Sequence, residues 1–83
     1  MTFAPVTTPD ELDALPVGEV VAGFVSGIIG EPEPTLEDGR ARWHGWRNAM
    51  VDCGLREPDA AYVELARALD EREALATQEA AIQ

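Results

Sequence analysis

The spacing of the apolar residues constrains the fold of this sequence more than any other feature. Between positions 16 and 30, apolar residues come in pairs that follow one another at intervals of four: Val20/Val21, Phe24/Val25 and Ile28/Ile29. This interval fits the turn of an α-helix, whereas a strand would alternate every two residues. The many Val and Ile residues and three internal Gly also suit a strand. We predict a helix that ends at Gly30.

A short helix is predicted before this segment. In the stretch TPDE, Thr8 can cap a helix, Pro9 fits its first turn, and Glu11 stands three residues after the cap. Pro16 must stop this helix after about two turns, because proline interrupts helical hydrogen bonding.

Two more helices are predicted after the acidic linker EPEPTLED. One runs from about Leu36 to Cys53 and stops at Gly54. The other begins near EPDA, with Pro58 in its first turn, and its apolar residues keep a helical register: Tyr62, Leu65, Ala66, Leu69 and Ala76. We expect a small all-α bundle of three to four helices.

The helix over 36–53 has two distinct stripes on a helical wheel. One is apolar and comprises Trp43, Trp46, Met50 and Cys53, with Ala49 at its edge. Such a stripe favours burial of the tryptophans in a core over stacking on a ligand. The other stripe comprises Arg40, His44 and Arg47, and we expect it to face outward. It could bind an acidic partner or a phosphate backbone, or it could neutralise the chain's own acids, which we favour slightly.

The length of 83 residues predicts a single small domain over 1–83, with frayed ends at about 1–7 and 78–83. A domain of this size is marginally stable, and the lone Cys53 excludes an internal disulfide. A homodimer therefore stays open. Gly23 and Gly27, four residues apart, predict a close backbone contact, either within the fold or across a dimer.

Charge is distributed unevenly along the chain, whose formal net charge is −10. Residues 1–38 carry eight acids and no base, residues 39–56 a net charge of +3, and residues 57–83 a net charge of −5. There is no lysine. An acidic surface repels nucleic acid, so we do not expect direct nucleic-acid binding.

Catalytic and metal-binding patterns are not found in the sequence, and we expect neither an enzyme nor a bound cofactor or metal. His44 and Cys53 are nine residues apart, which places them on opposite sides of one helix. One His and one Cys do not make a zinc site, and GFVSGIIG lacks the Lys followed by Ser or Thr that ends a phosphate-binding loop.

Two groups of acids are candidate partner-binding residues: Glu31, Glu33, Glu37 and Asp38 in the linker, and Asp70, Glu71 and Glu73 in the last helix. Their simplest role is solubility, which we favour. Alternatively, their carboxylates could imitate nucleic-acid phosphates and occupy a basic groove on another protein.

Two stretches, GFVSGIIG (Gly23–Gly30) and WHGWRNAM (Trp43–Met50), resemble the two-helix pattern of the bacterial ribosome modulation factor family, over about residues 20–52. The resemblance implies a helical fold and a ribosome- or RNA-binding translation regulator. The chain departs from that family in having no lysine and an acidic linker in place of a Cys-Pro-Tyr region.

The function expected first is a non-enzymatic regulator that binds a protein. Its most concrete form is a phage-type inhibitor, such as an anti-CRISPR protein, that blocks a basic nucleic-acid-handling complex of the host. The ribosome modulation factor-like role, acting through Arg40, His44 and Arg47, is the alternative. No membrane span and no leader sequence are expected, and the single free cysteine suggests the cytoplasm.

Overall fold

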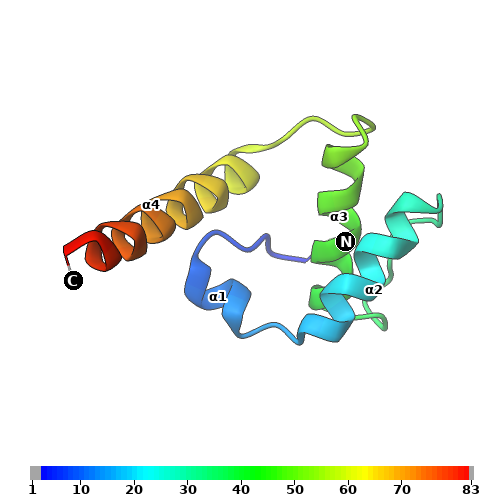
Figure 1. Ribbon diagram of the computed structural model, residues 1–83. Helices are drawn as coiled ribbons and strands as arrows, with labels where there is room; N and C mark the ends of the chain where they lie inside the picture. Colours follow the sequence, from blue (N-terminus) through cyan, green and yellow to red (C-terminus); the bar gives the residue numbers. More distant parts are fainter. Residues whose placement is uncertain (1–2, 83) are drawn as a thin grey trace.

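The computed structural model describes residues 3–82, with side chains described up to Glu79. Within this range the chain is all-helical and contains no strand, which confirms the predicted fold class (Figure 1). The four helices are α1 (Pro9–Asp13), α2 (Val17–Ile28), α3 (Arg40–Asp52) and α4 (Ala60–Ile82).

The predicted signals at the ends of α1 and α2 operate as expected. The Thr8 hydroxyl accepts a hydrogen bond of 3.2 Å from the Glu11 backbone N–H, and Pro9 stands in the first turn of α1. Helix α2 ends before Gly30, whose φ of 86° lies in the left-handed region that favours glycine. The N–H of Gly30 bonds to Gly27 and that of Glu31 to Ser26, so the last carbonyls of α2 are satisfied.

The predicted start of α3 was wrong by a few residues; α4 begins within EPDA, as predicted, but Pro58 lies before the helix and not in its first turn. Helix α3 begins at Arg40 and not near Leu36, because Asp38 accepts a 2.8 Å bond from the Thr35 N–H and closes a separate turn. Gly39 then takes a φ of 93°, which a helix cannot include. Helix α4 begins at Ala60, and Asp59 rather than Pro58 marks its start by accepting the Tyr62 N–H at 2.9 Å.

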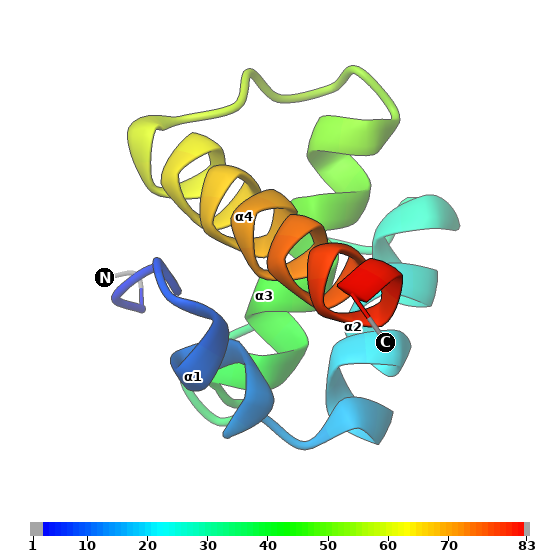
Figure 2. The same cartoon turned by 60° about the vertical axis from the view of Figure 1, so that its left-hand side comes forward.

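Helices α2 and α3 lie side by side and run in the same direction (Figures 1 and 2). Gly23 lies against Arg42, and one turn later Gly27 lies against Trp46 and Ala49. A Cβ atom on Gly23 would overlap the backbone carbonyl of Arg42. The close contact predicted for Gly23 and Gly27 therefore exists, and it lies within the fold.

A parallel helix pair needs a connection that returns along its whole length, and residues 29–39 provide it. Both indole N–H groups of α3 hold this return segment. Trp46 donates to the backbone carbonyl of Glu31 at 3.0 Å, and Trp43 donates to the carboxylate of Glu33 at 2.8 Å. The earlier tryptophan contacts the later glutamate, and the later tryptophan contacts the earlier glutamate. The return segment therefore runs antiparallel to α3.

The other side of α3 is covered by the N-terminal segment and by the first half of α4. Val6 is 1% exposed, and the Phe3 and Trp43 rings lie 5.8 Å apart. In the stretch 3–7, which we expected to fray, Val6 is buried and Phe3 and Thr7 are half-buried, whereas Ala4 and Pro5 are exposed and accept hydrogen bonds from Arg40 through their carbonyls. Residues 1 and 2 lie outside the described part. Leu65 of α4 is also buried.

The predicted apolar stripes are buried only in part. On α3, Trp43 and Ala49 belong to the core, Trp46 and Met50 are half-buried, and Cys53 is exposed at the helix end. Burial of Trp43 agrees with its interpretation as a core residue. Of the apolar residues predicted to share one face of α4, Leu65 is buried and Tyr62 and Leu69 are half-buried. Ala66 and Ala76 are exposed.

The second half of α4 projects away from the body of the protein (Figure 1). Beyond Leu69, its one described link to the body is an ion pair of 2.9 Å between Arg72 and Asp13 of α1, and the molecule measures 46 × 24 × 22 Å. The helix continues to Ile82, and fraying after Thr77 stays a prediction.

Candidate functional site

The cationic stripe predicted to face outward is largely buried, which corrects that expectation. His44 and Arg47 are each only 2% exposed. The helical wheel correctly separated this stripe from the tryptophans. However, α3 is covered on both sides, by α2 and the return segment on one and by the N-terminal segment and α4 on the other. Arg40 is half-buried and pairs with Glu11 at 2.9 Å.

Arg47 is held by one aromatic and one acidic partner. Its guanidinium carbon lies 5.2 Å from the centroid of the Trp43 ring, a distance that allows a cation–π interaction. It also forms an ion pair with Asp59, the residue that caps α4. The pKa of Asp59 lies below its ordinary value, chiefly because the Tyr62 backbone N–H donates to it, and Arg47 adds to this effect. Arg47 therefore joins α3 to the beginning of α4.

His44 is buried beside Arg47, and its pKa is lowered. The main cause is desolvation, which disfavours the imidazolium, and the charges of Arg47 and Arg40 act in the same direction. One ring nitrogen, Nε2, lies 3.2 Å from the Asn48 amide nitrogen. If Asn48 is oriented as assigned, Nε2 accepts and Nδ1 carries the proton. Nδ1 is buried and has no hydrogen-bond partner among the described residues.

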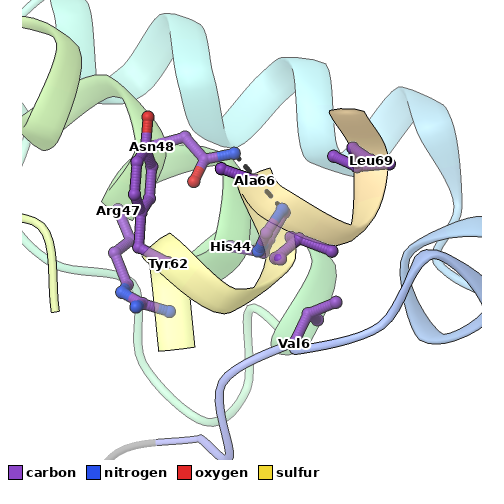
Figure 3. Close-up of a pocket in the computed structure, with 8 residues that line it drawn as sticks. Val6, His44, Arg47, Asn48, Tyr62, Ala66 and Leu69 are labelled. Atoms are coloured by element: carbon purple, nitrogen blue, oxygen red, sulfur yellow. Dashed lines mark hydrogen bonds between the residues drawn. The ribbon is translucent and has the colours of Figure 1, made fainter. Parts of the chain in front are cut away.

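A cavity of about 120 Å³ lies between α3 and α4 at His44. In Figure 3, His44 and Asn48 approach it from α3, Ala66 and Leu69 from α4, and Val6 from the N-terminal segment. Its walls are mainly apolar and comprise Val6, His44, Arg47, Asn48, Tyr62, Leu65, Ala66 and Leu69. Among the described residues, no cysteine or serine lines it, and Cys53 is exposed at the end of α3.

The linker acids are partly used by the fold. Glu33 accepts from the Trp43 indole, and Asp38 accepts from both the backbone N–H and the hydroxyl of Thr35, at 2.8 and 3.2 Å. The Thr35 backbone bond is the largest cause of a lowered Asp38 pKa. Glu31 binds Trp46 through its backbone carbonyl alone, and Glu37 is exposed. The carboxylates of Glu31 and Glu37 make no hydrogen bond or ion pair within the described residues.

The acids of α4 are the least engaged. Asp70, Glu71 and Glu73 are all exposed, and none forms an ion pair with another described residue. Asp70 and Glu73 share a shallow groove on α4 with Ala74 and Thr77. Figure 1 places this projecting part of α4 and the return segment on opposite sides of the molecule. The two acidic groups therefore do not form one surface.

Four of the six arginines form ion pairs with acids of the same chain: Arg40 with Glu11, Arg42 with Glu19, Arg47 with Asp59 and Arg72 with Asp13. Only four of the sixteen acids take part. Internal neutralisation, the interpretation that we favoured slightly for Arg40 and Arg47, agrees with these pairs. The acids outside them leave a strongly negative surface.

An exposed apolar surface along α2 was not predicted from the sequence. Its residues are Val17, Val21, Val25, Ile28 and Ile29, all at least half exposed, and we call it the outward face of α2. The pairs of adjacent apolar residues in the sequence already indicated that both sides of this helix are apolar. Because adjacent residues are about 100° apart on a helix, Val20 and Phe24 turn toward α3 while Val21 and Val25 turn away.

Searches against models of protein families, curated proteins and solved structures found no match. The likeness to the ribosome modulation factor family therefore rests on the two quoted stretches alone. Within residues 3–82, no helix combines the length and apolarity needed to cross a membrane. In the same range, no three His, Cys, Asp or Glu side chains converge as metal ligands would.

Proposed function

We propose that this chain is a non-enzymatic cytoplasmic regulator that binds a basic protein. Its most concrete form is a phage-type inhibitor, such as an anti-CRISPR protein, that occupies the nucleic-acid site of a host complex. The observation that carries this proposal is the separation of charges. The fold uses most of its arginines in internal ion pairs and leaves most of its acids exposed. Such a surface attracts basic partners and repels nucleic acid.

The acids of α4 are the proposed contact with the partner. Asp70, Glu71 and Glu73 lie on the part of the helix that projects from the body, where a groove of another protein could enclose them. Asp70 and Glu73 are three residues apart, so their Cβ atoms lie about 5–6 Å apart and their carboxylates stand side by side, whereas Glu71 points about 100° away from Asp70 round the helix. A basic groove that binds a phosphate backbone would accept carboxylates on two sides of one helix.

No observation favours the alternative of a ribosome modulation factor-like protein that binds RNA through Arg40, His44 and Arg47. Phosphate contacts need exposed, unpaired cations. His44 and Arg47 are buried, and Arg40 is paired with Glu11. The cationic face on which this alternative depended is not formed.

The proposed regulator is a homodimer. Among the described residues, the buried apolar side chains are few: Val6, Ala41, Trp43, Ala49 and Leu65. A core this small leaves an 83-residue chain marginally stable, and association would bury further apolar surface.

The test of partner binding combines co-elution with competition. The purified chain is mixed with a DNA-binding CRISPR surveillance complex, and both co-elution in gel filtration and DNA binding by the complex are measured. We expect co-elution, loss of DNA binding, and weakening of both effects as salt rises. A variant with Asp70→Asn, Glu71→Gln and Glu73→Gln should bind at least about tenfold more weakly, since rim charges steer and stabilise such contacts.

The matched control removes three exposed acids outside α4 that form no ion pair with another described residue: Asp10→Asn, Asp52→Asn and Glu57→Gln. It changes the net charge equally and should bind almost like the wild type. Equal weakening of both variants would show that total charge, and not the α4 surface, matters. A wild type that neither co-elutes nor displaces DNA would refute the inhibitor.

A further inference from the structure

We infer that the outward face of α2 is the surface through which two copies of this chain associate. This inference rests on the homodimer proposed above and names its interface. Helix α2 is apolar on both sides, and a helix of that kind is normally covered all round. One side is covered by α3, where Gly23 and Gly27 allow close contact. The other side is not covered by any described residue.

The size of the exposed surface supports this inference. Val17, Val21, Val25 and Ile28 follow one another at helical spacing, and each is between 50% and 75% exposed. Single exposed aliphatic residues are ordinary on protein surfaces, but a continuous apolar strip marks an interaction site. Because Val and Ile are stiff at χ1, they lose little side-chain entropy when another surface covers them.

The charge of this face identifies a second copy as the occupant. The single charged residue of α2 is Glu19, and its carboxylate is paired with Arg42 of α3 at 2.9 Å. The nearest acids in sequence lie beyond the two ends of the helix, at Asp13 and Glu31, and Asp13 is paired with Arg72. Two chains of net charge −10 repel each other at most other surfaces. At the outward face of α2, two copies of the chain can approach without placing unpaired acids against one another.

A basic partner fits this face less well than a second copy does. Such a partner gains affinity where its cations meet carboxylates, and the outward face of α2 has none. A neutral aliphatic strip is instead complementary to an identical strip related by twofold symmetry, because the same residues then meet from both sides.

The expected dimer is weak. A standard interface buries about 800 Å² on each partner. Helix α2 has 12 residues, which corresponds to a length of about 18 Å, and it presents only one side. The dimer should therefore dissociate on dilution.

The experiment measures association of the full chain by sedimentation velocity from about 1 μM to 1 mM, the range in which small interfaces dissociate. The wild type should shift from monomer to dimer within this range. The double variant Val21→Lys/Val25→Lys places like charges on both sides of a twofold interface. It should raise the dimer dissociation constant at least about 100-fold.

The matched control is Val63→Lys on α4, because Val63 and Val21 are almost equally exposed, at 55% and 54%. This variant should dimerise like the wild type. Circular dichroism of each variant checks that the helices remain. A rescue experiment mixes the Val21→Lys/Val25→Lys chain with a Val21→Glu/Val25→Glu chain, whose opposite charges should restore association.

The outcomes separate the two proposals. A wild type that stays monomeric up to 1 mM overturns both the homodimer and its interface. A wild type that dimerises equally well with lysines at positions 21 and 25 overturns the interface and leaves the homodimer standing. Neither result depends on the proposed inhibitory function, because no partner protein is present.

Discussion

At the scale of single residues, His44 shows how packing decides the state of a titratable group. It lies on a stripe with Arg40 and Arg47, which in sequence resembles a cationic surface. In the fold it is enclosed between α3, α4 and Val6, and its two charged neighbours oppose protonation. His44 is therefore a neutral core residue at neutral pH, and Arg47 beside it forms an ion pair with Asp59.

Because the folded protein holds the His44 pKa below its ordinary value of 6.5, acid should destabilise the fold. Above pH 6.5 the imidazole is mostly neutral in the folded and in the unfolded protein, so it does not change the free energy of unfolding. As the pH falls below 6.5, His44 binds a proton in the unfolded chain but stays neutral in the folded protein. Stability should then drop by up to about 1.4 kcal/mol per pH unit until the folded-state pKa is reached. Urea unfolding at a series of pH values measures this slope.

His44 is the only histidine, so its titration can be isolated between pH 6.5 and 5. The pKa values of Glu11, Asp38 and Asp59 are also lowered, but these acids lose their contribution only as pH falls below about 4.5. A His44→Asn variant should show no slope between pH 6.5 and 5, whatever its overall stability. A flat wild-type profile over that interval would contradict the burial of a neutral imidazole.

At the scale of helices, the parallel pair of α2 and α3 depends on backbone contact. Gly45 lies so close to α2 that an added Cβ would overlap the carbonyl of Val20, and Gly23 makes the reciprocal contact with Arg42. Backbone atoms cannot rotate out of the way as a side chain can. The two helices approach this closely because neither has a Cβ at its contact point.

Substitution of Gly45 by Ala should therefore destabilise the protein by about 1–3 kcal/mol or more, the usual cost of overpacking. Urea or thermal unfolding measures the change. Gly18→Ala in α2 is the matched control, because nothing lies within 4 Å of an added Cβ there. Removal of backbone freedom should stabilise that variant by about 0.4–1 kcal/mol. Equal effects at both sites would refute the close contact of α2 with α3.

At the scale of the whole molecule, stability is concentrated at one end. Helix α3 is surrounded by α2, the return segment, the N-terminal segment and the first half of α4, whereas the second half of α4 projects into solvent (Figure 1). A 23-residue helix gains little from its second half when no apolar residue described there, from Asp70 to Glu79, is buried. That half carries acids, and it serves the proposed function by exposing them.

Hydrogen exchange should reveal this gradient. Amide hydrogens of α3 should be the most strongly protected, and those of residues 73–82 should exchange at least about 100-fold faster, because local opening there breaks few contacts. Mass spectrometry of peptic fragments measures both regions in one experiment. Equal protection of residues 73–82 and α3 would show that the second half of α4 is covered in solution, by a second copy or by the body.

The local signals in the sequence determined the helices. Apolar spacing, the Thr8 cap, Pro16 and Gly30 act over four or five neighbouring residues, and these elements formed where expected. The same holds for the position of Gly23 and Gly27 at a close contact. The start of α3 was wrong by a few residues and Pro58 lies before α4, because Asp38 and Asp59 use their side chains to close a turn or cap a helix.

Only the tertiary structure decided which faces are covered. A helical wheel separates stripes but does not show how many neighbours a helix will have. His44 and Arg47 became interior residues because α3 is enclosed on both sides. Val21 and Val25, equally apolar in sequence, stayed exposed because α2 has one neighbour. Burial depends on contacts between residues far apart in the chain, such as Val6 with α3 and Arg47 with Asp59, and no local pattern encodes them.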